Sequence, residues 1–417
     1  MSADPLAAPS ASGSEARSRR PSQRWWTSGS GVPALWLWAG SRVSVLVFVL
    51  AAAQLTASGR PADFLDLWNR WDVSRLVFVA RHGFFPEGAL RAAAFTYEGE
   101  AHGGSVPWTV AYFPGQPLLL RAVHVVVGDW VAAGLLVSLV SGAIAVVALA
   151  RLADLELPGL GPRAVLALVS APFSVFLAAG YSEALFLACA LWSWYFARRR
   201  VWWAAGLLGA LAATTRITGV FLGMALAVEW LVSRRGATPH DSPGERPPAR
   251  RPAAVTLLWT FLPWLSTGVY FAWLRWQTGS WTAWQQAQSL YWHRGFAMPW
   301  QALATTWHTA TTSHHPAFAF TYTAEILAVL VGVGLTGALL AYRRWAEASY
   351  VGLQIVAFAT STQFYSVTRA TLLWWPLWLL LATWTIRHPR LGYAYLGISA
   401  PLAAAVTLGF VTAHWVG

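Results

Sequence analysis

Asp72 follows Trp71 in a stretch that is charged on one side and apolar on the other. The stretch reads DLWNRWDVSRLVFVARHGFF, and on a helix its apolar side would carry Trp68, Trp71, Leu76, Val79 and Ala80. An amphipathic helix of this kind lies in the membrane interface, at the depth of lipid headgroups. A carboxylate held there can be partly desolvated, which makes it a better base, so Asp72 is a candidate general base toward a hydroxyl group. The structural alternative is that Asp72 pairs with Arg75 or caps a helix.

Three other ionisable residues stand at turns that we expect on the same side of the membrane. Glu183, in GYSE, opens a predicted span, where the helix dipole favours an acid; it could also orient acceptor hydroxyls. Arg216, in TTRITG, and Arg369, in YSVTRATLLWWP, lie where the positive-inside rule gives no reason for a cation. A guanidinium matches phosphate geometry, so both are candidates to stabilise a departing lipid phosphate. The alternative for both arginines is that they extend to lipid headgroups.

Aromatic residues alternate with amides in RWQTGSWTAWQQAQSLYWHRGFAMPW. Such a loop suits the apolar faces and hydroxyls of a sugar, or else forms an interfacial aromatic belt. Arg294 in this loop, and His82 after Asp72, are candidates to assist the two arginines at a phosphate. No metal site is predicted, because the cluster of histidines downstream has neither nearby carboxylates nor ligand spacing: His308, His314 and His315.

The composition indicates the elements that must position these residues. The chain of 417 residues is 56% hydrophobic and 11% charged, has a mean hydropathy of +0.46 and contains 28 tryptophans. This composition is typical of an integral membrane protein and excludes independent soluble domains. The net charge of +12 comes from 29 basic residues, all arginine, in clusters between apolar runs. That pattern follows membrane topology and does not predict nucleic-acid binding.

Apolar runs predict an all-α polytopic bundle of about eleven transmembrane helices with external juxtamembrane helices. The candidate spans are 33–57, 130–150, 164–180, 182–197, 201–215, 217–233, 253–274, 324–342, 346–360, 370–386 and 392–413. With a cytoplasmic N-terminus, each arginine cluster between spans then falls inside, provided that Thr109 to Val127 lies on the outer face without crossing.

The predicted organisation is one membrane domain after a polar tail. Residues 1–31 read as a disordered cytoplasmic tail and residues 32–417 as a single integral membrane domain. Two long external loops, 58–129 and 275–323, hold most of the candidate chemistry, and 234–252 reads as a flexible cytoplasmic linker. The segment from Phe113 to Arg121, with two prolines, is expected to border the path of a lipid tail.

Six motifs in order resemble the PIG-V-type mannosyltransferases, the GPI mannosyltransferase II family and its bacterial homologues. They are WDVSRLVFVARHGF, AYFPGQPLLLR, APFSVFLAAGYSEALFL, ATTRITGV, WLRWQTGSWTAWQQAQSLYWHR and SVTRATLLWWPL. The resemblance implies a GT-C glycosyltransferase fold and an inverting transfer of mannose from a polyprenyl-phosphate carrier on the outer face. It makes Asp72 the general base and assigns Glu183 and Arg216 to family motifs. The substrate-binding candidates also include Trp71 and Gln116. At the position of Gln116 the family has a tyrosine between two prolines.

The expected function is therefore a hexosyltransferase that uses no metal or cofactor beyond its lipid-linked donor. Its acceptor could be a glycolipid, a glycan or a protein hydroxyl. The absence of lysine and the single asparagine suggest a GC-rich bacterial genome, so the expected location is a bacterial plasma membrane, with an actinobacterial lipid-linked mannose pool under the analogy. The alternatives are transfer of another sugar from the same carrier, a lipid or sugar transporter or flippase, and a scaffold without chemistry. Transporters favour ionisable residues at the midplane and repeated halves, which this sequence does not show.

Overall fold

The computed structural model describes residues 29–56, 64–86, 106–235 and 253–416. Most of the predicted tail and linker, and part of the first external loop, lie outside these residues. The described chain is helical apart from turns and one isolated bridge between Phe296 and Ser361. Its α-helices are α1 (Gly31–Thr56), α2 (Asp72–His82), α3 (Gly115–Val127), α4 (Trp130–Glu156), α5 (Gly161–Val169), α6 (Glu183–Arg198), α7 (Trp202–Ala213), α8 (Gly219–Arg235), α9 (Leu262–Thr278), α10 (Ala283–Trp292), α11 (Pro299–Thr312), α12 (Pro316–Ala341), α13 (Trp345–Ala359), α14 (Val367–Ala370), α15 (Trp375–Arg387) and α16 (Pro389–Val411). The 3₁₀ turns are Trp108–Ala111, Ser174–Leu177, Ala254–Phe261 and Thr371–Leu373.

Five helical stretches among the described residues are long and apolar enough to cross a membrane. They are Gly31–Gln54, Trp130–Glu156, Ala254–Thr278, Pro316–Ala341 and Pro389–Val411. A helix of 26 residues, such as α12, is about 39 Å long, whereas a bilayer core is about 30 Å thick. The protein is thus a polytopic helical membrane protein, as predicted. The other expected spans form shorter helices of 9 to 17 residues, so eleven crossings remain a prediction.

Two predicted spans are interrupted near a proline. The span expected at 164–180 is not continuous, because α5 ends at Val169 and a 3₁₀ turn begins at Ser174. Pro172 lies in this break; proline lacks an amide hydrogen and disfavours helical backbone in the residue before it. The span expected at 370–386 likewise begins only with α15, which has Pro376 in its first turn. The second break begins just after Arg369, one of the candidate site residues.

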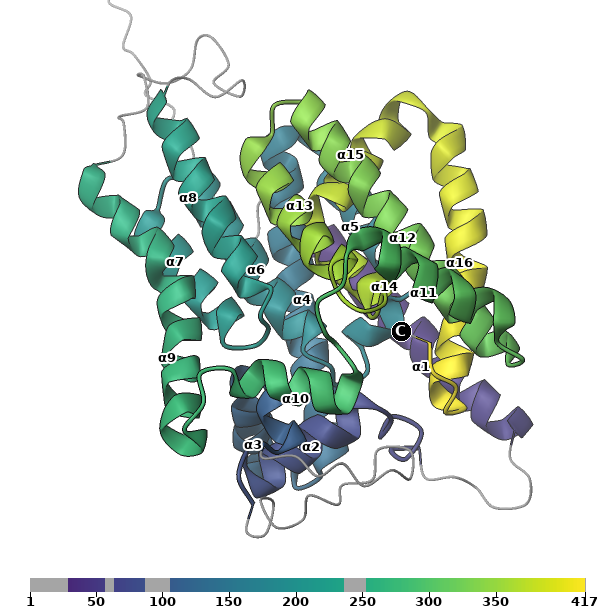
Figure 1. Ribbon diagram of the computed structural model, residues 1–417. Coiled ribbons are helices and arrows are strands. Elements are labelled where there is room, and N and C mark those ends of the chain that lie inside the picture. The colour runs from purple at the N-terminus through teal and green to yellow at the C-terminus, as the bar shows by residue number, and fades with distance from the viewer. Residues whose placement is uncertain (1–28, 57–63, 87–105, 236–252, 417) are drawn as a thin grey trace, which may run out of the picture.

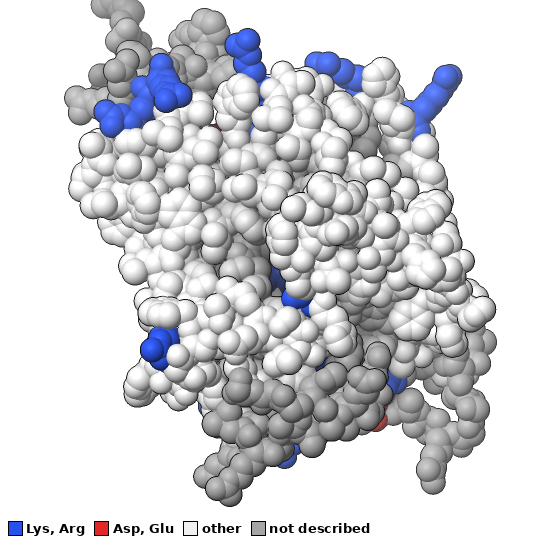
Figure 2. Space-filling model, viewed as in Figure 1, with Lys and Arg blue, Asp and Glu red and all other residues white. Residues whose placement is uncertain are grey.

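The segment Thr109 to Val127 forms a 3₁₀ turn and the 13-residue helix α3. At about 20 Å, α3 is shorter than a bilayer core of about 30 Å, as are several helices in the other expected spans, so the place of this segment on the outer face stays a prediction. In Figure 1, α2, α3 and α10 lie together at one end of the bundle. The opposite end is where α8 and α15 finish in arginines, and Figure 2 shows blue side chains gathered there.

The main core joins the long helices through small residues and aromatic rings. Trp38 of α1 donates a hydrogen bond from Nε1 to the carbonyl oxygen of Leu139 in α4, at 3.1 Å. Gly142 makes this close packing possible, because a β-carbon at that position would lie 2.1 Å from the Trp38 ring. A second, aromatic cluster holds the 3₁₀ turn Trp108–Ala111 and the segment before α3 against α9 and α10. This second cluster fixes one wall of the pocket that contains Asp72.

Candidate functional site

A charged pocket opens beside the first turn of α2, with a cavity volume of about 180 Å³. Its wall is built from α2, the segment before α3, the turns at 181–182 and 215–218, α10 and the segment before α14. On the face shown in Figure 2 the molecule is hollowed near its middle, with blue arginine atoms at the lower edge of the hollow. The lining residues with polar or charged side chains include Asp72, Arg75, Tyr112, Ser182, Arg216, Gln288, Arg294, Ser366 and Arg369.

Asp72 is the first residue of α2, and its carboxylate is held by three side chains. Oδ2 lies 2.8 Å from Nη1 of Arg369, and Oδ1 accepts a 2.8 Å hydrogen bond from the Tyr112 hydroxyl. Arg75, one turn along α2, is more distant, with Nη1 3.7 Å from Oδ1. The carboxylate therefore joins three segments that are far apart in the sequence, with Arg369 as its strongest partner.

The pKa of Asp72 is lowered, which corrects the expectation that desolvation makes it a better base. Burial is the largest single influence and raises this pKa, but the charges of Arg369 and Arg75 together with hydrogen bonds from Arg369 and Tyr112 outweigh burial and bring the pKa to about 2. Burial and the neighbouring Asp72 charge raise the pKa of Tyr112, so its hydroxyl stays protonated and donates. In this state Asp72 is a firmly ionised carboxylate and a weak base.

Trp71 and Tyr181 orient Asp72. The backbone of Trp71 has a φ of 50°, in the left-handed region that side chains other than glycine rarely adopt. The amide of Asp72 donates to the Tyr181 hydroxyl at 3.3 Å. Trp71 also lines the pocket. The strained backbone at Trp71 turns the start of α2 toward the cavity.

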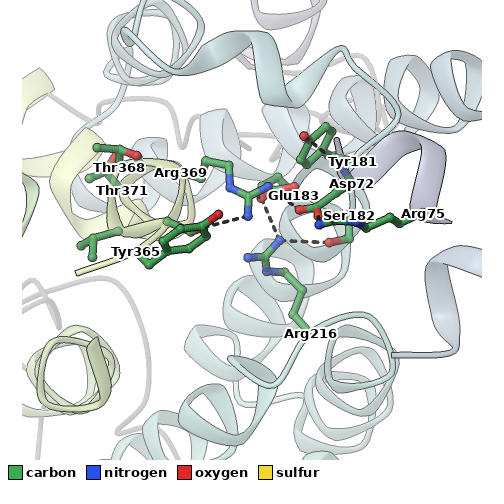
Figure 3. Close-up of polar contacts among 12 residues, drawn as sticks. Asp72, Arg75, Tyr181, Ser182, Glu183, Arg216, Tyr365, Thr368, Arg369 and Thr371 are labelled. Atoms are coloured by element: carbon green, nitrogen blue, oxygen red, sulfur yellow. Dashed lines mark hydrogen bonds and ion pairs between the residues drawn. The ribbon is translucent and has the colours of Figure 1, made fainter. Parts of the chain in front are cut away.

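Glu183 lies behind two arginines of the pocket. Its side chain is fully buried, and Oε1 lies 2.8 Å from Nη1 of Arg216 and 3.8 Å from Nε of Arg369. Neither carboxylate oxygen has a partner at good hydrogen-bond geometry despite the short Arg216 distance. Nη1 of Arg216 also donates to the Ser182 hydroxyl at 3.0 Å, as Figure 3 shows. Glu183 is absent from the pocket wall, and its contacts are with the two arginines.

The short helix α14, which carries Arg369, is anchored by a buried carboxylate that the sequence analysis missed. Glu325 of α12 accepts backbone amide hydrogen bonds from Ser366, Val367 and Thr368 at 2.9, 2.7 and 3.2 Å. The Thr368 hydroxyl adds a fourth bond at 3.0 Å. An anion at the start of the short helix α14 neutralises its free amides and fixes its direction. An acid within an apolar span is a signal that could have identified Glu325 from the sequence.

Arg294 reaches the pocket from the loop after α10. Its Nη2 donates to the Tyr365 carbonyl oxygen at 3.3 Å, and its guanidinium lies 5.0 Å from the centre of the Tyr365 ring. The pocket is therefore electropositive: the cluster contains Arg75, Arg216, Arg294 and Arg369 against Asp72 and Glu183, and four positive minus two negative charges gives +2. A cavity with this surplus of guanidinium groups suits a phosphate.

Two predicted residues do not reach the cavity. Gln116 is fully buried and donates from Nε2 to the Gly180 carbonyl oxygen at 3.2 Å, behind the pocket wall. His82 is exposed at the far end of α2, where its ring lies 4.7 Å from that of Phe78. Ten residues of helix separate His82 from Asp72 by about 15 Å. The structure therefore gives Gln116 a packing position and removes His82 from the phosphate-binding candidates.

An apolar groove of about 660 Å³ adjoins the charged pocket between α3, α7 and α9. The two share a border, since Pro114 and Thr214 line the groove while Phe113 and Thr215 line the pocket. At this border the amide of Gly115 donates to the Thr214 carbonyl oxygen at 2.7 Å. The predicted segment Phe113 to Arg121 thus contributes to both cavities, and the groove walls include Leu118, Leu207, Leu265 and Val269.

A second ionic cluster lies on the helices away from this pocket. Arg198 of α6 contacts Glu156 and Glu229 at 3.1 and 3.6 Å, and Arg344 contacts Glu156 and Glu347 at 2.9 and 2.6 Å. These residues come from α4, α6, α8 and the start of α13, and all are largely buried. Within the described ranges, no three His, Cys, Asp or Glu side chains gather as a metal site requires.

The fold and the pocket define a polytopic helical membrane protein with an electropositive, carboxylate-containing cavity beside an apolar groove. No protein-family model matches the chain, and no solved structure is significantly similar to it. Part of the chain is similar to the protein named GPI alpha-1,6-mannosyltransferase 2. The Rattus norvegicus protein is 32% identical over 164 residues, 36% of this chain and 29% of its own length. The Mus musculus protein is 34% identical over 171 residues, 38% of this chain and 31% of its own length. The match spans less than a third of these relatives and is a distant, partial similarity.

Proposed function

We propose that this protein transfers mannose from a polyprenyl-phosphate carrier to an acceptor hydroxyl. Partial similarity to mannosyltransferases supports a glycosyltransferase activity. The observation that carries the proposal is the pairing of Asp72 with Arg369 at 2.8 Å in a cavity that borders an apolar groove. An enzyme that uses a lipid-linked sugar needs a base for the acceptor hydroxyl, cations for the donor phosphate and an apolar path for the lipid tail.

The donor phosphate binds among the arginines of the pocket, and the prenyl chain lies in the groove. Arg369 and Arg216 point into the same space from opposite sides of Glu183 (Figure 3). The groove is lined almost entirely by apolar side chains from α3, α7 and α9. A prenyl chain keeps an apolar environment when it moves from the lipid into this groove, so the groove guides the chain by its shape and packing. The phosphate and the tail therefore fix the donor with its sugar toward Asp72.

The transfer is a single displacement with inversion at the anomeric carbon. The acceptor oxygen forms a bond to that carbon while the carbon–oxygen bond to the phosphate breaks. Asp72 takes the acceptor proton, and the phosphate leaves with one more negative charge than it had in the donor. Arg216 and Arg369 stabilise this added charge, which exists only as the reaction proceeds.

Donor binding releases Asp72 for its role as base. Arg369 cannot contact both the phosphate and Asp72 with its full charge, so a bound phosphate weakens the pair measured at 2.8 Å. Loss of this partner raises the pKa of Asp72, because burial, which opposes ionisation, is then less well offset. The base thus becomes effective only when the donor is present, which limits unproductive chemistry.

We also propose that the arginine-rich end of the bundle is cytoplasmic and that the pocket end faces outward across a bacterial plasma membrane. The arginines that close α8 and α15 lie at the end away from α2, α3 and α10. The positive-inside rule then orients the bundle. The acceptor is a glycolipid, a glycan or a protein hydroxyl presented on that outer side.

The proposed activity is tested with membranes or nanodiscs containing the protein and labelled polyprenyl-phosphate mannose. The expected result is release of free carrier together with a new mannosylated product. Matched carriers bearing glucose or arabinose show which sugar the pocket accepts. Movement of intact donor across vesicles without cleavage would instead establish a flippase and refute the proposal.

A further inference from the structure

The chain folds back after α16 and brings Trp415 to the charged pocket. α16 ends at Val411, and the amide of His414 donates to the Gly409 carbonyl oxygen at 2.8 Å. Ala413 has a φ of 62°, so the backbone reverses direction there. Trp415 then lines the cavity that contains Asp72, although 343 positions separate the two residues (415 minus 72).

Trp415 is fixed in this position by α12. The Thr321 hydroxyl donates to the Trp415 carbonyl oxygen at 3.1 Å. The rings of Phe318 and Tyr322, also in α12, lie 6.1 and 5.5 Å from the indole. Val416 is buried beside Gly409, where a β-carbon would approach it to 2.7 Å. These contacts fix the position of the indole in the pocket wall.

The indole stacks on Tyr365, which connects it to the arginines. Ring centres of Trp415 and Tyr365 are 4.8 Å apart with 28° between the planes. The guanidinium of Arg294 lies 5.0 Å from the centre of the same Tyr365 ring. Ser366, next in the chain, accepts a 3.0 Å hydrogen bond from Arg369, the partner of Asp72. An aromatic platform of Tyr365 and Trp415 thus lies beside the charged centre.

This platform lies away from the apolar groove. The groove is formed by α3, α7 and α9, whereas Trp415 is held by α12 and the end of α16. Figure 1 shows the C-terminus beside α11 and α14, with α7 and α9 across the bundle. If the donor occupies the groove and the arginines, the platform borders the space that remains for the second substrate.

We propose that Trp415, supported by Tyr365, is a specificity residue that binds the apolar face of a pyranose ring in the acceptor. The inference rests on the proposed transferase function. An aromatic ring packs against the C–H groups on one face of a pyranose and leaves the hydroxyls free for hydrogen bonds. A simple alcohol, such as a glycerol or serine hydroxyl, offers no such face. The protein should therefore prefer an acceptor hydroxyl carried by a sugar.

Kinetics with two surrogate acceptors test the preference. Octyl α-mannoside carries a pyranose, and 1-O-octylglycerol has the same alkyl chain without a ring. Trp415→Ala should lower kcat/KM for octyl mannoside by roughly threefold to tenfold. It should leave kcat/KM for octylglycerol and KM for the donor unchanged, and Trp415→Phe should retain most of the preference. Trp36→Ala is the matched control, since Trp36 is 74% exposed and outside the pocket wall. A raised KM for the donor would assign Trp415 to the donor sugar and overturn the inference.

Saturation-transfer NMR with methyl α-mannoside separates this inference from the proposed activity. In nanodiscs the wild-type protein should transfer saturation to the ring protons, and Trp415→Ala should lose most of that transfer while keeping its thermal unfolding midpoint. Equal transfer to both proteins, or none to the wild type, overturns the platform. If the protein binds the sugar ring through Trp415 but shows no transferase activity, the proposed function is refuted and the role of Trp415 in sugar binding stands.

Discussion

Replacing Arg369 by glutamine should raise the pKa of Asp72. Nη1 of Arg369 lies 2.8 Å from Oδ2 of Asp72. Burial raises this pKa, yet the two neighbouring arginines, Arg369 first, bring it from an ordinary 3.8 to about 2. That net change corresponds to about 2 kcal/mol in favour of the ionised form. An adjacent opposite charge lowers a carboxyl pKa by about 1 to 3, so in Arg369→Gln the pKa should lie between about 3 and 5.

The sign of the pH effect follows from the role of Asp72 as a base. Only the ionised carboxylate accepts a proton, so the dependent activity is lost as the pH falls through the pKa. The wild-type kcat/KM for the donor reports the substrate-free enzyme. Its pH profile should show no acid limb from Asp72 above about pH 3. In Arg369→Gln that limb should rise to between about pH 3 and 5. Infrared titration of the substrate-free protein gives the same pKa directly, with the Asp72→Asn spectrum identifying the band.

Arg75→Gln is the matched control for this prediction. Nη1 of Arg75 lies 3.7 Å from Oδ1 of Asp72, farther than Arg369, and its charge ranks second in lowering the pKa. Its loss should therefore raise the pKa of Asp72 by less than the loss of Arg369. The same pKa in wild type and Arg369→Gln, or a larger change in Arg75→Gln, would refute the claim that Arg369 sets the charge state of Asp72.

Three further changes probe the elements around the pocket. Arg198→Ala removes the ion pair of the buried Glu229 and one of the two arginines that contact Glu156, so it should cost about 3 kcal/mol of stability, seen as a lower thermal unfolding midpoint; an unchanged midpoint would contradict a stabilising role. Val269→Trp narrows the apolar groove and should raise KM more for a long-chain prenyl donor than for a short-chain analogue; equal effects on both would remove the tail from the groove. Glu325→Gln weakens the anchor of α14 and should lower kcat by roughly tenfold or more, about 1.4 kcal/mol, while KM for the acceptor stays constant.

The convergence of Asp72, Arg216 and Arg369 could be anticipated from the sequence. Each arginine stands at a turn where membrane topology does not require a cation, and Asp72 opens an amphipathic helix. The charge state of Asp72 could not be anticipated, because its dominant partner is 297 positions away in the chain. Sequence reasoning included burial but had no distance to Arg369, so it gave the wrong direction for the pKa.

Other parts of the site left weaker signals in the sequence. Trp415 is one of 28 tryptophans, and nothing in its local sequence marks it as part of a pocket. Tyr112 belongs to the motif AYFPGQPLLLR, but that motif does not indicate a contact with Asp72. By contrast, helix geometry alone places His82 about 15 Å from Asp72, and Pro172 marks the break after α5. The sequence alone predicts those two features, whereas the pairing of Tyr365 with Trp415 depends on the tertiary fold.

The central claim is tested most directly by measuring mannose transfer from polyprenyl-phosphate mannose in Asp72→Asn. Asparagine keeps the size of the side chain and can accept the Tyr112 hydrogen bond, but it cannot take the acceptor proton. The account predicts a loss of about a hundredfold to ten-thousandfold in kcat, in a protein that remains folded in the membrane. Transfer at the wild-type rate by Asp72→Asn would contradict the account.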